Sequence, residues 1–262
     1  MKKIIALILA LTMVFALCAC GAAEAPEQVV EQQEEKKALP VATVTEPEAT
    51  AAPLYKDIMK PYSDIEHGKR LIILQNTLQF SREGVFTEAE TPVAEPVSFN
   101  GADYNGYPMS AATRFLTEAL EGDVTVYTTD DASVTVSAAD FEAATVLVDD
   151  FQSGNSPILL LANGTAVENF DYAVMASGEG IFSIISEQNV NLMDLFADYG
   201  WDTSLTYNVV ATDVFYIPVT PEDYDEGGLR GALSGAINAN FVDMVIATGK
   251  LNDVVFIEQI VG

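Results

Sequence analysis

The chain has 262 residues, of which 49% are hydrophobic, and 39 acidic residues against 12 basic ones give a formal net charge of −27. A surface this negative argues against nucleic acid as a partner and against direct adhesion to anionic lipid. With one histidine in the chain, a metal site built from several histidines is excluded.

The first twenty residues have the layout of an export signal. Two lysines precede an apolar run over residues 4–17, which is too short to cross a membrane comfortably. The run ends in "LCAC", residues 17–20, and this ending resembles the lipobox of bacterial lipoproteins. The resemblance implies that a signal peptide, residues 1–19, is removed and that the Cys20 sulfur carries lipid. The alternatives are an ordinary signal peptide that contains cysteines and a buried apolar helix.

The lipobox interpretation predicts that the protein is located at the extracytoplasmic face of the cell membrane. Cys18 leaves with the signal peptide and Cys20 is consumed by lipid, so the mature chain has no free thiol. Two acyl chains on Cys20 give stable anchoring. Residues 22–53 are rich in Ala, Glu, Gln, Pro and Thr and have no aromatic residue. Such a segment cannot bury enough apolar surface to offset chain entropy, so we expect an acidic, disordered tether.

Two later stretches, residues 124–142 and 207–225, resemble each other at a constant offset of 83 residues. Each reads as a hairpin with an Asp-containing turn, after which a hydroxyl residue caps a short helix. The alternative is two similar capped hairpins that arose by chance. The aligned pairs are Thr129 with Thr212, Asp130 with Asp213, Val136 with Val219, Ser137 with Thr220, Asp140 with Asp223, and Phe141 with Tyr224.

The same kinds of element flank the two hairpins. Helices are expected before them, over residues 108–120 and 191–200, because apolar residues recur there at helical spacing. Strands are expected after them in four apolar stretches: residues 156–162 and 172–176 in the first copy, 241–247 and 253–260 in the second. A further strand is expected upstream at residues 69–80.

These patterns predict an α+β fold with mixed sheets and short capped helices, and the repeat suggests two tandem related α+β units. The expected organisation is a signal peptide (1–19), a lipidated Cys20 with its tether (20–53), an N-terminal extension of the folded region (54–107), a first unit (108–186) and a second unit (187–262).

The turn at Thr128–Asp131 and the later segment "GNSPIL", residues 154–159, carry a second resemblance. They are similar to the hairpin turn and the G-x-P-L segment of the sulfite-oxidase-like molybdopterin-binding domain. The resemblance implies a shared fold used as a binding or scaffold module. That family holds molybdenum through a cysteine and grips its cofactor with basic residues. The mature chain lacks a free cysteine, and beyond Gly101 its basic residues are Arg114, Arg230 and Lys250, so no cofactor is expected.

Candidate chemistry is sparse. The chain contains no G-x-S-x-G motif whose serine His67 could activate. We therefore expect His67 to be a surface loop residue rather than a catalytic base. Neighbouring carboxylates could hold Ca²⁺ or hydrolyse a glycoside, but turn and cap roles explain most of them and no EF-hand spacing is present. These carboxylates are Asp130 with Asp131, Asp149 with Asp150, and Asp223 with Asp225 and Glu226.

Aromatic residues beside turns could stack on a flat ligand, although such residues more often cover the edge of a core. No catalytic residue and no metal ligand is assigned. The candidate ligand-binding residues are Tyr104, Tyr107, Asp130, Asp131, Trp201 and Asp213.

Together these features favour a lipid-anchored surface protein that binds a small molecule or a protein without catalysis. One alternative is the solute-binding receptor of an ABC importer, against which stands the lack of βαβ repeats. The other is an enzyme, either a carboxylate hydrolase or a divergent molybdopterin oxidoreductase. The missing thiol, the single histidine and the scarce basic residues argue against it.

The substitution Cys20→Ser tests the anchor, because a serine hydroxyl cannot take the thioether-linked lipid. We expect the variant to lose incorporation of radiolabelled palmitate and to appear in the medium, while the parent stays in the membrane fraction. Unchanged membrane retention of Cys20→Ser would contradict the lipobox interpretation.

Overall fold

The computed structural model describes residues 67–80, 92–149, 151, 155–185, 189–213, 215–224, 227–231 and 242–261. All of them belong to one compact unit, Thr50–Gly262. The expected signal peptide, Cys20 and the tether lie outside the described residues, as do Asp150, Asp225 and Glu226. Within the described part of the chain, no helix is both long and apolar enough to cross a membrane.

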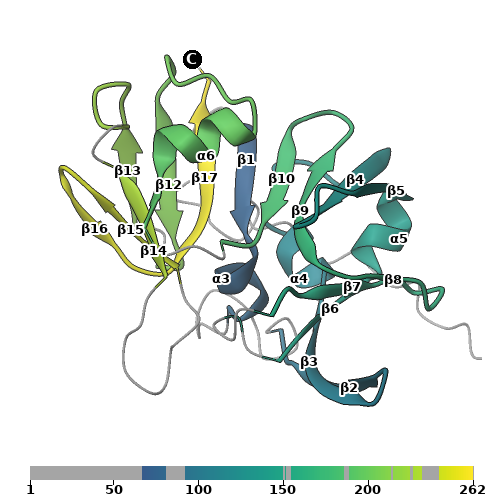
Figure 1. Ribbon diagram of the computed structural model, residues 1–262. Helices are drawn as coiled ribbons and strands as arrows, with labels where there is room; N and C mark the ends of the chain where they lie inside the picture. Colours follow the sequence, from purple (N-terminus) through teal and green to yellow (C-terminus); the bar gives the residue numbers. More distant parts are fainter. Residues whose placement is uncertain are drawn as a thin grey trace, which may run out of the picture. The chain divides into compact units, whose positions relative to one another are not determined.

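The fold is α+β and rich in strands, as the sequence predicts, and its described residues form a central sheet of eight strands. β1 lies in the middle of this sheet, between β17 and β10 (Figure 1). The order across the sheet is β13 (Tyr216–Val219), β12 (Tyr207–Ala211), β17 (Val254–Ile260), β1 (His67–Ile73), β10 (Gly180–Ser183), β9 (Phe170–Met175), β4 (Asp123–Thr128) and β5 (Ser133–Ser137).

Two smaller sheets flank the central one (Figure 1). The first has the order β2 (Glu95–Phe99), β3 (Ala102–Pro108), β6 (Thr145–Val148), β7 (Ile158–Leu160) and β8 (Ala166–Val167). The second has the order β11 (Val190–Asn191), β14 (Gly228–Gly231), β15 (Val242–Ile246) and β16 (Gly249–Leu251).

The described helices are short, and two of them have side-chain caps. Ser137 accepts a hydrogen bond from the backbone N–H of Asp140, and Asn191 accepts one from that of Met193, which satisfies amide groups that a helix start leaves open. The helices are α3 (Leu74–Leu78), α4 (Ser110–Thr113), α5 (Ala138–Glu142) and α6 (Leu192–Asp198).

The two halves of the chain share one pairing scheme. In the first half β4 pairs with β5 and β9, and in the second half β12 pairs with β13 and β17. Equivalent bonds recur 83 residues apart: Tyr107 pairs with Val146 and Val190 with Leu229, while Met109 N–H donates to Ala144 O and Leu192 N–H to Gly227 O. The aligned Phe141 and Tyr224 are both buried. A common ancestor of the halves stays a prediction.

The strands β4 and β12 each pair with a third strand through a β-bulge at the same position. The register shifts between Tyr127 and Thr128 in the β4–β9 pair, and between Val210 and Ala211 in the β12–β17 pair. Such a β-bulge inserts one extra residue into a strand and turns neighbouring side chains toward the same face. The extra residue in each pair is Asp171 in β9 and Val255 in β17.

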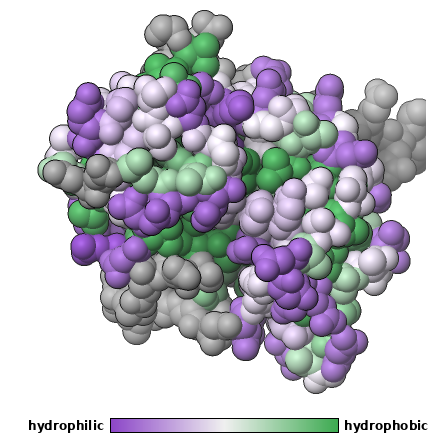
Figure 2. All heavy atoms as spheres, turned by 45° about the horizontal axis from the view of Figure 1, so that its top comes forward, coloured by the Kyte–Doolittle hydropathy of each residue, from purple (hydrophilic) through white to green (hydrophobic). Residues whose placement is uncertain are grey.

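The two hydrophobic cores lie on opposite faces of the central sheet. Successive side chains of a strand point to opposite faces, and along β1 Ile72 belongs to the first core while Leu71 and Ile73 belong to the second. On the face of the molecule seen in Figure 2, hydrophilic residues predominate and hydrophobic residues show between them.

Several local expectations were wrong. Residues 69–80 form β1 followed by α3 rather than one strand, and His67 begins β1 rather than lying in a loop. The helix expected over 108–120 reaches only Thr113, because Phe115 and Leu116 then bond to carbonyls three residues back, as in tighter 3₁₀ turns. Thr220 bonds to the Asp223 carboxylate as a capping box would, yet the segment forms a turn.

Asn76 in α3 ties the first half of the chain to the second. It is fully buried, and its side-chain amide donates to the carbonyls of Val242 and Val254 at 2.8 and 2.5 Å. Its oxygen accepts from the Val242 N–H at 2.8 Å. One side chain thereby satisfies backbone groups at the starts of both β15 and β17.

We expect Asn76→Ala to lower the free energy of unfolding by about 2–5 kcal/mol, because a buried N–H and two carbonyls lose this partner. Urea titration followed by circular dichroism measures the change. Asn163→Ala is the matched control, since the exposed Asn163 side chain accepts one bond, from Thr165 N–H, and should cost less than about 1 kcal/mol. Equal losses of unfolding free energy in the two variants would contradict the role of Asn76 in joining the two halves.

Candidate functional site

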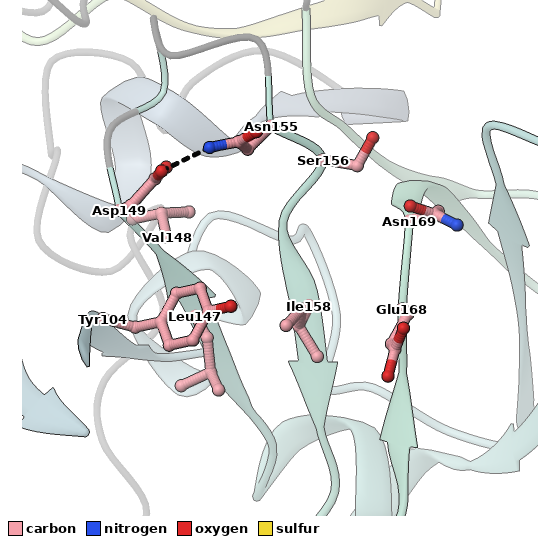
Figure 3. Close-up of a pocket in the computed structure, with 9 residues that line it drawn as sticks. All are labelled: Tyr104, Leu147, Val148, Asp149, Asn155, Ser156, Ile158, Glu168 and Asn169. Carbon is pink, nitrogen blue, oxygen red and sulfur yellow. Dashed lines mark hydrogen bonds between the residues drawn. The ribbon is translucent and has the colours of Figure 1, made fainter. Parts of the chain in front are cut away.

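An open pocket of about 340 Å³ lies over the flanking sheet of the first half. Its apolar floor comes from Leu147 and Val148 in β6 and from Ile158 in β7. Polar side chains surround this floor (Figure 3): Tyr104 from β3, Asp149 after β6, Asn155 and Ser156 before β7, and Glu168 and Asn169 in the turn before β9.

One wall of the pocket is held by Asp149. Its carboxylate accepts a hydrogen bond from the side-chain amide of Asn155 at 2.5 Å, the bond drawn in Figure 3. Its backbone carbonyl accepts from the Asn105 side chain at 3.4 Å. These bonds join the end of β6 to the start of the next segment and fix the position of the carboxylate.

The opposite wall is tied to the β4–β5 turn. Thr129 N–H donates to the carbonyl of Asn169 at 2.9 Å, and its hydroxyl lies 3.5 Å from that of Ser156. Asn169 adopts a left-handed conformation with φ of 59°, which asparagine tolerates better than most residues. Asp149, after the end of β6, and Glu168, after the end of β8, line the same pocket.

One sequence candidate lines this pocket, a turn that carries two others approaches its rim, and a fourth lies behind it. Tyr104 lines the pocket, and the turn that carries Asp130 and Asp131 reaches its rim through Thr129. Asp130 itself accepts from the Thr128 hydroxyl at 2.5 Å, which is a turn role. Tyr107 lies three residues along β3 and packs instead on the first core and on Phe151. Burial raises the pKa of Tyr107.

The remaining candidates lie in the second half. Asp213 is exposed, and its carboxylate accepts from Phe215 N–H within the β12–β13 turn. Trp201 is 8% exposed and stacks on Tyr207, with ring centroids 5.1 Å apart and planes at 13°. Burial raises the pKa of Tyr207 to about 12. This aromatic packing places Trp201 in the second core, so little of the indole surface is accessible to a ligand.

The pocket residues that the sequence did not single out are Leu147, Val148, Glu168 and Asn169. Asp149 was visible as a carboxylate beside Asp150, and Asn155 and Ser156 belong to the segment 154–159 that carried the second resemblance, but nothing in the sequence brings these residues together. Among the described residues, no group of three or more His, Cys, Asp or Glu side chains could hold a metal ion. Comparisons with protein-family models, with curated proteins and with solved structures gave no match.

We expect Trp201→Ala to lower the free energy of unfolding by about 3–5 kcal/mol, because it opens a cavity beside Phe196 and Tyr207. Trp201 is the single tryptophan of the chain, so unfolding is followed by circular dichroism rather than by fluorescence. Trp201→Phe, which keeps an aromatic ring, should cost less. A loss below about 1 kcal/mol in Trp201→Ala would show that the residue is not part of the core.

Proposed function

We propose that this chain is a surface protein held at the extracytoplasmic face of the membrane by lipid on Cys20, and that it works as a non-enzymatic binding module. The lipobox-like ending of the apolar run supports the location. The pocket beside Tyr104 supports the binding role, because it combines an apolar floor with convergent polar side chains, as small-molecule sites do.

The pocket suits a small hydroxyl-rich ligand such as a sugar. The volume of about 340 Å³ lies at the lower end of the range for small-molecule sites. A tyrosine ring offers a flat surface for stacking, carboxylates accept hydrogen bonds from hydroxyls, and side-chain amides both donate and accept. Tyr104, Asp149, Asn155 and Glu168 supply all three kinds of group.

An enzyme is the second candidate, because Asp149 and Glu168 line the same pocket and a pair of carboxylates is what glycoside hydrolysis requires. A p-nitrophenyl glycoside tests it: release of nitrophenolate that is lost in Glu168→Gln would favour the hydrolase over the binding module.

The solute-receptor alternative gains no support from the described architecture. Receptors of that kind are expected to consist of lobes built from βαβ units, whereas β1 with β10 is the parallel pair among the described strands and the other pairs are antiparallel.

The sugar-binding proposal predicts that Tyr104→Ala weakens affinity at least tenfold for whichever neutral monosaccharide binds, since the stacking surface is removed. Calorimetric titration with glucose, galactose and N-acetylglucosamine measures this, with the protein in a sugar-free, non-ionic detergent. Tyr216→Ala is the control, because Tyr216 is a surface tyrosine (45% exposed) in the edge strand β13 and does not line the pocket. Equal affinities of the parent and Tyr104→Ala, or no binding of any of the three sugars, would overturn the proposal.

A further inference from the structure

A second candidate site lies on the central sheet, on the face that packs beside the second core. Tyr127 of β4 and Tyr172 of β9 are partners in the strand register and stack in parallel, with ring centroids 4.5 Å apart and planes at 11°. Tyr199, just after α6, meets Tyr172 edge to face at 5.1 Å. We call these three residues, together with Asp171, the tyrosine face.

The β-bulge in β9 brings a carboxylate to this face. The register passes from Tyr172 to Phe170, and Phe170 belongs to the first core on the other side of the sheet. Asp171 is the extra residue, so it lies beside Tyr172 rather than opposite it. Tyr199 is fixed in turn by Ser183, whose hydroxyl lies 2.5 Å from the tyrosine oxygen.

The pairing scheme of the second half has an equivalent for each of these positions, and there the residues are apolar and fully buried. Val210 pairs with Phe256 as Tyr127 pairs with Tyr172. Ile72, the strand partner of Phe256, corresponds to Ser183, the strand partner of Tyr172. Phe115, whose ring packs on Phe256, corresponds to Tyr199, whose ring packs on Tyr172. The exposed fraction is 0% for Val210, Val255, Phe256, Ile72 and Phe115.

This contrast separates a structural role from a binding role. In the second half the equivalent surface is part of the first core and needs only apolar volume. In the first half Tyr127, Asp171 and Tyr172 stay partly exposed, and a carboxylate replaces the buried Val255. If this face had only a packing role, the partly desolvated Asp171 carboxylate would cost stability compared with an apolar side chain.

The charge around the tyrosine face is negative. Burial and then the nearby Asp198 carboxylate raise the pKa of Asp171. Burial is also the largest cause that raises the pKa of Tyr172, followed by Tyr127 and the carboxylates of Asp171, Asp198 and Asp131. These groups come from β9, α6 and the β4–β5 turn.

We propose that the tyrosine face binds the ammonium group of a small organic cation. Tyrosine rings attract a cation to their faces, and quaternary ammonium ligands are held in proteins by aromatic side chains of this kind. Asp171 supplies the opposite charge. A second copy of the chain is disfavoured as the occupant, because two surfaces of the same negative sign would meet.

The test uses the full chain in a sugar-free, non-ionic detergent, with choline as the cation and 3,3-dimethylbutan-1-ol as its uncharged counterpart of the same shape. Calorimetry at low ionic strength should detect choline and at least tenfold weaker binding of the neutral alcohol. Tyr172→Leu and Asp171→Asn should each weaken choline binding at least fivefold. Glu222→Gln, which removes an exposed carboxylate elsewhere, should leave it unchanged.

Stability measurements separate loss of the site from loss of the fold. A carboxyl group whose pKa is raised in the folded state destabilises that state progressively as pH rises through its unfolded pKa, and the full cost is present above its folded pKa. Asp171→Asn should therefore unfold at the same or a higher temperature than the parent at pH 7, and should show no such gain near pH 3. Reduced choline binding without reduced stability supports the site.

Three outcomes would overturn the proposal: equal affinity for choline and the neutral alcohol, no choline binding at 10 mM, or unchanged binding in Asp171→Asn. Each is independent of the sugar titrations at Tyr104, so failure of the tyrosine face and failure of the proposed pocket remain distinguishable.

Discussion

The structure depends on β1, the strand that both halves of the fold share. Both of its edges are paired, with β17 and with β10, and its faces supply both cores. Arg70 lies inside this strand with no exposed surface, and a buried charge is costly unless it is paired. Its guanidinium donates to Glu258 of β17 and to the carbonyl of Phe115, both at 2.6 Å, and lies 4.2 Å from the Phe256 ring centroid.

A shared pairing scheme with unlike surfaces explains how one fold offers two candidate sites. Around β1 each half contributes a hairpin, a small flanking sheet and a returning strand. Where the second half fills a bulged face with Val255 and Phe256, the first half carries Asp171 and Tyr172 on the equivalent positions. The bulged strand pairing is common to both halves, but its side chains are buried and apolar in the second half and partly exposed in the first half.

The pocket beside Tyr104 follows from the same architecture. Strands of the flanking sheet provide an apolar floor, and the segments that leave them carry Asp149, Asn155 and Glu168. Backbone polar groups at strand ends must find partners, and the bond between Thr129 and Asn169 meets that need while closing one side. Strand ends and turns, rather than helices, therefore position the polar groups.

The sequence by itself determined the α+β class and many of the strands, because alternation, capping and turn residues act over a few positions. It aligned Phe141 with Tyr224, and both are buried. It also placed Tyr104 among the candidates. Only the tertiary structure decided that Trp201 is a core residue and that residues 69–80 divide into a strand and a helix. The stack of Tyr127, Tyr172 and Tyr199 was equally invisible, because register and a bulge bring together residues that lie up to 72 positions apart (199 minus 127), and no local pattern encodes such pairings.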